Sequence, residues 1–577
     1  MDDRAAPGAG VLVSRGRGHD DVPLMSTTTG GDGSPTTTAD DQVATAGGSG
    51  WVQRHWVGLL AAVAALAVLV GNVHGIATGD DGVGYRAIAD SLISGNGLGY
   101  FLERPLTIWP PLWPSLMAAL AWATPLSTTG AAILLNALTV AAAVLVGHRL
   151  LSRLVLDQHL VLLGTLVIGL GSSTIGFGHL LMTDFAFAVV VMCLLLTLLT
   201  AQERTAWWWP GVAGLWVWVG FGLRYVAVAL VGIGGLWLLL DGSRKFVTRV
   251  GRAALFGAVS VLVPVLWMVR NHSLDGTYTG ERYPSARGLV DNAFDIVATL
   301  GRFLLPGVAN GFDKVWAAVG LMGLAAAVVV VWQVLGAPRT VAGVERSGTG
   351  RPSLLLRVNR AWAVLGRGPG LLFLTAVLYL TYMLYVRSTT ALNQLDLRLL
   401  NPAYFPLLTL GLVVVDSTRA LGPDSAQPWH RRGVLAARIW AGANVLAGVA
   451  GLLLFLSGNQ FFNGNYSADT FVEVRNNPAL DALPAGCRTY SNLPNGLYPA
   501  VEAKWSPRRT GLESNERVDD FERLEPTLAT RPTCLVWIDA EPRYGHLWPL
   551  AQLKAELDLQ QLATSGDVTV YRMLPRG

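Results

Sequence analysis

Charged residues are scarce in this sequence. Asp, Glu, Lys and Arg make up 14% of the 577 residues, while 52% are hydrophobic. A soluble protein typically has about a quarter charged residues, so this shortage excludes an ordinary soluble fold and requires apolar surroundings. The formal net charge of +4 is no sign of nucleic-acid binding, since the basic residues of membrane proteins gather in cytoplasmic loops.

The N-terminal segment lacks any apolar run. Polar stretches such as STTTGGDGSPTTTADD do not fit a cleavable signal peptide, which needs an apolar centre. Residues 1–50 are therefore predicted to be a disordered cytoplasmic tail.

Long runs without any acid, Lys or Arg do occur, for example at 59–77, 131–147 and 321–335. A helix of about 20 apolar residues crosses a bilayer, so the chain is predicted to be a polytopic α-helical membrane protein with about eleven spans in a domain at 51–456. The spans are expected near 56–76, 129–147, 160–178, 184–200, 210–223, 225–240, 254–269, 314–335, 371–387, 402–415 and 435–456.

Basic residues predict the orientation of these spans. Arg54 precedes the first span, and the loop 336–370 is rich in arginine. Because basic loops stay in the cytoplasm, the N-terminus is expected there, and the loop 77–128 outside the inner (plasma) membrane. Within that outer loop, PPLWPSLMAALAWATP is short and bounded by prolines, which predicts an interfacial or re-entrant helix.

An odd number of spans also places residues 457–577 outside. This tail has strand-like runs CRTYSN, TCLVWIDA and VTVYRM and helix-like runs DDFERLEPTL and LWPLAQLKAELDL, which predicts a small extracytoplasmic α/β domain. Its segment YSNLPNGLY is interpreted as a plain turn rather than a ligand-facing loop.

Cysteine is rare, with three residues in the chain. Cys193 lies in an apolar span and is expected to pack in the core. Cys487 and Cys534 both lie in the tail, where an oxidising compartment permits a disulfide; two reduced, buried thiols are the alternative.

Ionisable residues near the span ends are the candidate site. Such groups are costly at membrane depth and usually serve a site, and most of these are predicted on the outer face, where they could converge on one cavity. They are Asp80, Asp81, Glu103, Asp184, Arg224, Arg270, Arg282, Asp396 and Arg398.

The first outer loop is the most specific stretch. Asp80 and Asp81 follow the first span directly, and an amphipathic helix comes next. An isolated Asp-Asp pair is also typical of a helix cap at the membrane surface. The helix presents one apolar face, formed by Tyr85, Ile88, Ala89, Leu92 and Ile93.

Four stretches resemble motifs of the GT-C glycosyltransferase superfamily, in the branch of protein O-mannosyltransferases and lipid A aminoarabinose transferases. The first outer loop carries an acidic pair, then Tyr85 and A-x-x-L-x-x-G at positions 89–95. LLMTDFAFAVV is similar to the second acidic motif, with Asp184 as its carboxylate. VPVLWMVRNHSLDGTYTGER and NQLDLRLLNPAYFPLLTL are similar to a middle W-x-x-R-N motif and to a late motif with Asp, Arg and two prolines.

The resemblance implies an inverting glycosyltransferase that moves a sugar from a polyprenyl-phosphate donor to an acceptor hydroxyl. Such a transfer needs a general base and a cation for the leaving phosphate. Asp80 or Asp81 would be the base, with Asp81 preferred because it is nearer the following helix. Asp184 would orient the acceptor or the base. The phosphate candidates are Arg224, Arg270 and Arg398, and Tyr85, Arg282 and Asp396 are further candidates.

No cofactor is certain. Glu103 lies where the aminoarabinose transferases have an acidic residue linked to metal, which would allow a divalent metal. No nearby His supplies a second ligand, so the sequence does not decide whether a metal binds. The W-W-D motif of oligosaccharyltransferases is absent, which argues against oligosaccharide transfer to asparagine. The acceptor in the cell envelope can be a glycan, a lipid or a protein; the sequence does not decide among them.

Two other classes compete with the enzyme. A lipid-linked sugar transporter or flippase would be expected to have repeated halves, broken helices and charges inside the bundle. No such repeat is found. A non-catalytic GT-C-like scaffold is disfavoured by the intact acids Asp80, Asp81 and Asp184.

Overall fold

The computed structural model describes residues 43–576 except 103, 306–311, 337–366, 422, 459–464, 519 and 540–543. Most of the predicted tail 1–50 and of the loop 336–370 therefore lies outside the described residues. The chain divides into two compact units, Met1–His55 and Trp56–Gly577. The helical bundle and the tail domain both belong to the second unit.

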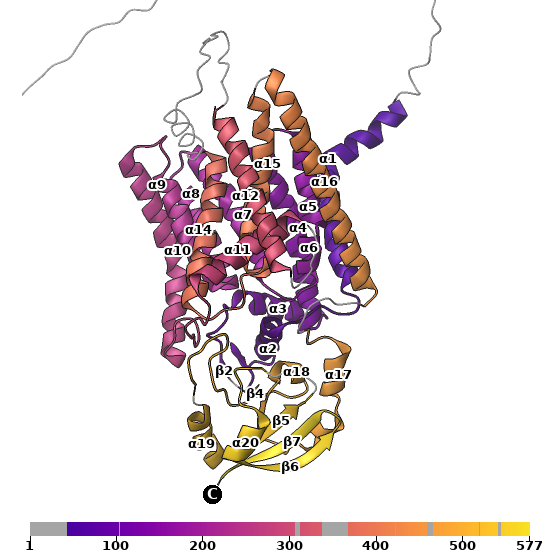
Figure 1. The fold of residues 1–577 in the computed structure, drawn as a ribbon, viewed down its shortest axis with the longest axis vertical. Coiled ribbons are helices and arrows are strands. Elements are labelled where there is room, and N and C mark those ends of the chain that lie inside the picture. Colours follow the sequence, from indigo (N-terminus) through magenta and orange to yellow (C-terminus); the bar gives the residue numbers. More distant parts are fainter. Residues whose placement is uncertain are drawn as a thin grey trace, which may run out of the picture. The chain divides into compact units, whose positions relative to one another are not determined.

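Within the described residues, 8 helical segments are long and apolar enough to cross a membrane. Figure 1 shows them as a bundle of long helices. They are Thr128–Leu154 (α4), Gln158–Gly178 (α5, Gln158–Leu170, with α6, Ser172–Gly178), Asp184–Glu203 (α7), Phe246–Asp275 (α10), Asp313–Trp332 (in α12, Asp313–Gly336), Gly368–Thr389 (α14), Leu397–Ser417 (α15) and Pro428–Leu456 (in α16, Pro423–Leu456).

Three predicted spans correspond to shorter apolar helices. They are His55–Gly71 in α1 (Val43–Gly71), α8 (Trp209–Leu223) and η1 with α9 (Tyr225–Val228 and Ala229–Leu239). The 15 residues of α8 extend about 23 Å, less than the bilayer core of about 30 Å. The multi-pass helical fold is confirmed, with eight long spans where hydropathy predicted about eleven.

The first outer loop folds as expected into two helices. The amphipathic helix is α2 (Asp80–Ile93), and the proline-bounded segment is α3 (Leu112–Ala123), which packs against α2, α4 and α8. Two short antiparallel strands, β1 (Gly99–Tyr100) and β2 (Arg104–Pro105), lie between them. The remaining elements of the bundle are α11 (Leu289–Leu304) and η2 (Thr418–Leu421).

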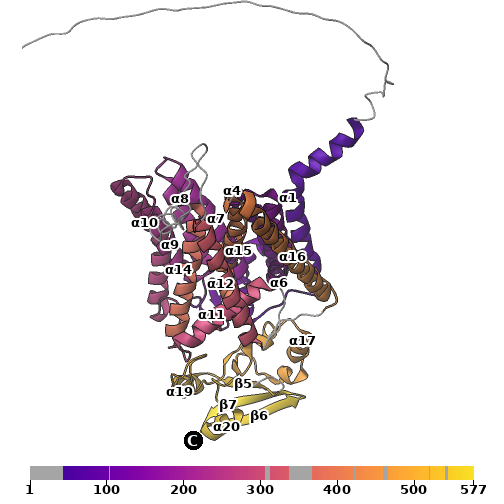
Figure 2. The ribbon, with the colours of Figure 1, turned by 45° about the horizontal axis from the view of Figure 1, so that its top comes forward.

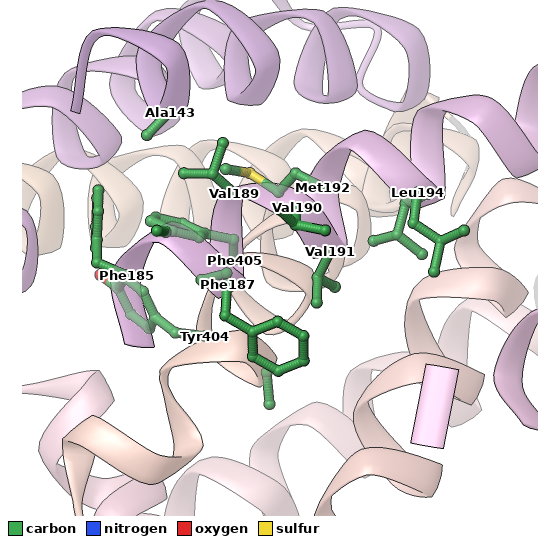
Figure 3. Packing of buried hydrophobic residues seen from close by; sticks show 14 of the residues in the cluster. Ala143, Phe185, Phe187, Val189, Val190, Val191, Met192, Leu194, Tyr404 and Phe405 are labelled. Atoms are coloured by element: carbon green, nitrogen blue, oxygen red, sulfur yellow. The ribbon is translucent and has the colours of Figure 1, made fainter. Parts of the chain in front are cut away.

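Helix α7 lies in the core of the bundle. It packs against α4, α8 and α15, and 78% of its most apolar stretch is buried. Figure 3 shows Phe185 and Phe187 of α7 beside Tyr404 and Phe405 of α15. The ring centroids of Phe185 and Phe405 are 5.7 Å apart. Helix α7 is therefore a span that is enclosed mainly by protein.

The tail is an α/β domain built on a five-stranded sheet with strand order β4-β3-β5-β7-β6. Its central strand β5 is parallel to β3 and antiparallel to β7. Figure 2 shows β5, β7 and β6 of this sheet together in the tail domain. The strands are β3 (Arg488–Ser491), β4 (Lys504–Trp505), β5 (Thr533–Ile538), β6 (Leu557–Ser565) and β7 (Val568–Pro575). The helices are α17 (Asp469–Arg475), η3 (Pro478–Ala482), α18 (Pro494–Leu497), α19 (Asp520–Thr530) and α20 (Leu550–Glu556).

The tail matches the predicted strands and helices except in one segment. The run LWPLAQLKAELDL was expected to be wholly helical, but α20 ends at Glu556 and β6 begins at Leu557. Pairing along the whole of β7 overrides the helical pattern there, because Gly566 with φ of 53° closes the β6–β7 hairpin.

The cysteines of the tail are bonded. Cys487 and Cys534 form a disulfide with their Cα atoms 5.9 Å apart. Of the two alternatives given by the sequence, a disulfide or two reduced thiols, the structure has the disulfide. This bond joins the start of β3 to β5. Cys193 is a free thiol, partly buried against the core of the bundle, as expected.

Candidate functional site

The acidic pair forms the first turn of α2. The N-cap is Gly79, and no side chain caps this helix, so the pair is not a helix cap. Both carboxylates lie at the N-terminal end of the helix dipole, which favours their negative charge. Their side chains bind in different directions.

Asp80 binds the tail domain. Its Oδ1 accepts hydrogen bonds from the Tyr466 hydroxyl at 2.7 Å and from Asn495 Nδ2 at 2.6 Å. The Tyr466 hydroxyl also lies 3.1 Å from that of Tyr544. Asp80 is exposed, and its Oδ2 takes no part in these bonds. The tail thus fixes one oxygen of Asp80.

Asp81 binds the bundle instead. Its Oδ1 accepts from Trp109 Nε1 at 3.0 Å, and its Oδ2 lies 3.4 Å from a terminal nitrogen of Arg398. Arg398 stands in the first turn of α15. Asp396 caps that helix by accepting from the backbone N–H of Arg398 at 3.0 Å and of Leu399 at 3.1 Å. Asp396 therefore positions Arg398.

Asp184 begins α7 and is 1% exposed. It pairs with Arg224, whose terminal nitrogen is 2.7 Å from Oδ1. Arg224 follows the last residue of α8 in an extended conformation. Tyr85 of α2 is buried, and its hydroxyl lies 3.4 Å from that of Thr183. Burial raises the pKa of Tyr85, and the charge of Asp81 adds to this, so the hydroxyl stays neutral.

Two glycines of α2 allow this close arrangement. A Cβ on Gly82 would lie 2.8 Å from the carbonyl oxygen of Leu181, just before the α7 acid. A Cβ on Gly84 would lie 2.5 Å from the ring of Trp109, the residue that binds Asp81. Any larger side chain would separate α2 from both neighbours. The glycines of DDGVGY are therefore needed for packing.

The remaining candidates differ in their surroundings. Arg282 is exposed, donates to the carbonyl of Thr279 at 2.8 Å, and experiences the charges of Asp81 and Arg224. Arg270 donates to the carbonyl of Leu106 at 2.8 Å and covers the ring of Trp267 at 4.3 Å. These contacts tie Arg270 to the backbone of the first outer loop. Glu103 lies outside the described residues.

The acids and arginines of four separate segments therefore meet at one end of the bundle. The structure brings together Asp81, Asp184, Arg224 and Arg398, with Asp80 beside them and Arg282 within electrostatic reach. Sequence reasoning missed Tyr466 and Asn495. The only available signal was the Asn within YSNLPNGLY, interpreted as a plain turn. Across the described ranges, no group of three or more His, Cys, Asp or Glu could hold a metal ion.

The fold and the cluster define a multi-pass membrane protein with a charged site between its helical bundle and an α/β tail domain. The sequence matches no protein-family model and no curated protein sequence.

Several solved structures are similar to this chain. ArnT from Cupriavidus metallidurans in the apo state is 16% identical, with coverage of 90% of this chain and 98% of that one and a TM-score of 0.48. The arabinofuranosyltransferase AftD from Mycobacteria is 13% identical, covering 91% and 42%, with a TM-score of 0.47. The Archaeoglobus fulgidus oligosaccharyltransferase with a tethered acceptor peptide is 12% identical, covering 85% and 70%, with a TM-score of 0.45. Two of these three proteins are thus an arabinofuranosyltransferase and an oligosaccharyltransferase.

Proposed function

We propose that this protein is an inverting glycosyltransferase that moves a sugar from a polyprenyl-phosphate donor to an acceptor hydroxyl. The observation that carries the proposal is the convergence of acids and arginines from α2, α7, α15 and the end of α8 on one site beside the tail domain. Such a transfer needs both kinds of group, a base for the hydroxyl and cations for the phosphate. ArnT is also known bound to undecaprenyl phosphate.

Asp80 is the general base in this proposal. The sequence alone favoured Asp81, but both oxygens of Asp81 already have partners, one of them the Arg398 cation. An acceptor hydroxyl would therefore have to displace a partner to reach Asp81. In the described part of the chain, Asp80 has partners on one oxygen only, both of them neutral, and it is exposed. It therefore has an oxygen free to accept a proton.

In the reaction, the acceptor oxygen bonds to the anomeric carbon from the side opposite the phosphate. Its proton passes to Asp80, and the bond from the anomeric carbon to the phosphate oxygen breaks. The phosphate keeps the electron pair, so negative charge develops on it. Guanidinium groups match phosphate oxygens in a bidentate manner, and we propose Arg282 and Arg398 for this role.

Asp184 and Arg224 support the site rather than react. Their pair is nearly excluded from solvent, with side-chain exposures of 1% and 16%. A buried pair of this kind holds the neighbouring helices in one arrangement. We propose that it fixes the start of α7 under α2. The basic loops support an orientation in the inner (plasma) membrane with the tail outside.

The test measures transfer of radiolabelled sugar from polyprenyl phosphate in membranes that contain the native chain or a variant. Asp80→Asn should lower the rate by about 10²–10⁴-fold, the usual contribution of a general base. Asp81→Asn should cause a smaller loss, because it releases Arg398. Asp481→Asn is the matched control, since Asp481 is an exposed carboxylate of the tail. Unchanged transfer by Asp80→Asn at equal protein level would refute the assignment of the base.

A further inference from the structure

A polar cavity is lined in part by Tyr466, the residue whose hydroxyl donates to Asp80. It has a volume of about 170 Å³, enough for a phosphate-sized group. It is formed where the end of α1, the helix α2 and the tail domain meet. Its lining residues are His74, Gly75, Thr78, Val83, Arg86, Tyr466, Ser467, Arg475 and Tyr498.

The cavity has more positive than negative charge around it. Arg86 and Arg475 line it, and the described lining residues include no carboxylate. Arg86 forms an ion pair with Asp90, whose Oδ2 lies 3.7 Å from Nε, a separation beyond hydrogen-bonding distance. The Nε of Arg86 is buried without a hydrogen-bond partner. One guanidinium nitrogen inside the protein therefore lacks an acceptor.

Arg475 binds only backbone in the described part of the chain. One terminal nitrogen donates to the carbonyl oxygens of Tyr466 at 2.9 Å and Gly496 at 3.4 Å. Burial lowers the pKa of Arg475, and the charge of Arg86 lowers it further. Arg86 and Arg475 repel each other, and Asp90 pairs with Arg86 alone. An anion between them would relieve this repulsion.

The two arginines are the groups of the cavity that suit an oxyanion. Hydroxyl groups of Thr78, Ser467 and Tyr498 also line the cavity, but each already donates its one proton, to the carbonyl of Ile76, to Thr78 and to Asp90 respectively. Guanidinium groups bind phosphate with two parallel hydrogen bonds. We propose that this cavity binds a phosphate group through Arg86 and Arg475.

The position of the cavity links it to Asp80. The hydroxyl of Tyr466 donates to Asp80, while its backbone carbonyl accepts from Arg475. A phosphate in the cavity is thus held one residue away from the acid of the site. Both a phosphate that arrives with a substrate and the headgroup of a membrane lipid have the required chemistry. The binding itself does not depend on the reaction proposed above.

The experiment follows thermal unfolding of the full-length protein in neutral detergent as inorganic phosphate is added. The reference is sodium chloride of equal ionic strength, because a ligand that binds the folded state raises the unfolding temperature. Phosphate should stabilise the native chain. At least about tenfold more phosphate should be needed for Arg475→Gln or Arg86→Gln, which lose a charge-assisted pair.

Two variants keep this result interpretable. Arg475→Lys retains the charge and should retain part of the phosphate effect, so it separates loss of binding from loss of folding. Arg531→Gln, at an exposed arginine of the tail, should respond like the native chain. No stabilisation by phosphate, or equal stabilisation of the native chain and Arg475→Gln, would overturn the proposal.

Lipid in the micelle identifies the source of the phosphate. If phosphatidylglycerol raises the phosphate concentration needed for the native chain and phosphatidylcholine does not, the site takes an anionic lipid headgroup. If neither lipid competes, the site takes a phosphate that arrives with a substrate. Either result supports phosphate binding, and sugar transfer is not measured, so failure here is distinct from failure of the proposed reaction.

Discussion

Helices α7 and α12 are equally apolar but occupy different environments. The most apolar stretch of each has a mean hydropathy of 2.3, yet 78% of that stretch is buried in α7 and 11% in α12. Each helix also begins with an acid that pairs with an arginine, Asp184 with Arg224 and Asp313 with Arg302. Although the two helices are similar in these respects, α7 is enclosed by protein and α12 lies at the surface of the bundle.

The comparison shows what hydropathy can and cannot specify. Lipid tails are as apolar as Leu side chains, so an apolar helix gains nothing by exchanging one for the other. Neighbours are instead chosen by packing and by polar groups. In α7, these are the aromatic contact of Phe185 with Phe405 and the buried ion pair of Asp184.

The two ion pairs provide the sharpest test of this difference. Removing Asp184 by Asp184→Ala leaves Arg224 charged and buried, which should cost about 3–5 kcal/mol of unfolding free energy. Asp313 is 40% exposed, so Asp313→Ala should cost only about 0–1 kcal/mol. Unfolding in mixed micelles with increasing SDS gives both values.

A double variant separates the charge from the packing. Replacing both partners, as in Asp184→Leu with Arg224→Met, should recover much of the loss, because the buried pair is a weaker source of stability than its breakage suggests. Similar losses for Asp184→Ala and Asp313→Ala would mean that α7 is no more enclosed than α12.

Apolar contacts should follow the same order at a smaller scale. Leu195 of α7 is fully buried, while Leu321 of α12 is 58% exposed. Leu195→Ala leaves a cavity and should cost about 2–4 kcal/mol. Leu321→Ala exchanges a side chain for lipid and should cost less than about 1 kcal/mol. The same SDS titration measures both, and equal costs would contradict the enclosed position of α7.

The sequence predicts the parts of this molecule that depend on local pattern. Runs of apolar residues predict the long helices, and short strand-like runs predict β3, β5 and β7 of the tail. Asp81, Asp184, Arg224 and Arg398 were grouped from their predicted position at span ends, and they do meet.

The rest of the site depends on contacts far apart in the chain. Asn495 lies 415 residues from Asp80, which it binds, and its own segment reads as a turn because Pro and Gly flank it. Tyr466 has no distinguishing pattern around it either. The cavity of Arg86 and Arg475 forms only when the tail closes over α2. Such pairings follow from tertiary packing, for which a single sequence contains no periodic signal.

The smallest effect concerns a close backbone contact between α12 and α11. Gly320 of α12 and Gly301 of α11 bring the two helices so close that an added Cβ would overlap backbone, at Val297 and Trp316 respectively. Small residues allow such approach between helices in membranes. Gly320→Ala should therefore cost about 1–3 kcal/mol, because overpacking forces the backbones apart.

Gly257 of α10 is the matched control for this change. An added Cβ there meets nothing within 4 Å, so Gly257→Ala should be neutral or should stabilise the helix by up to about 1 kcal/mol. A loss confined to Gly320→Ala in the SDS titration would mean that α12, despite its exposed surface, has one specific face, against α11. A neutral result for both variants would mean that α12 has no specific face even against α11, so that it differs from α7 over its whole surface. A helix held without a close backbone contact depends on lipid as much as on its neighbours.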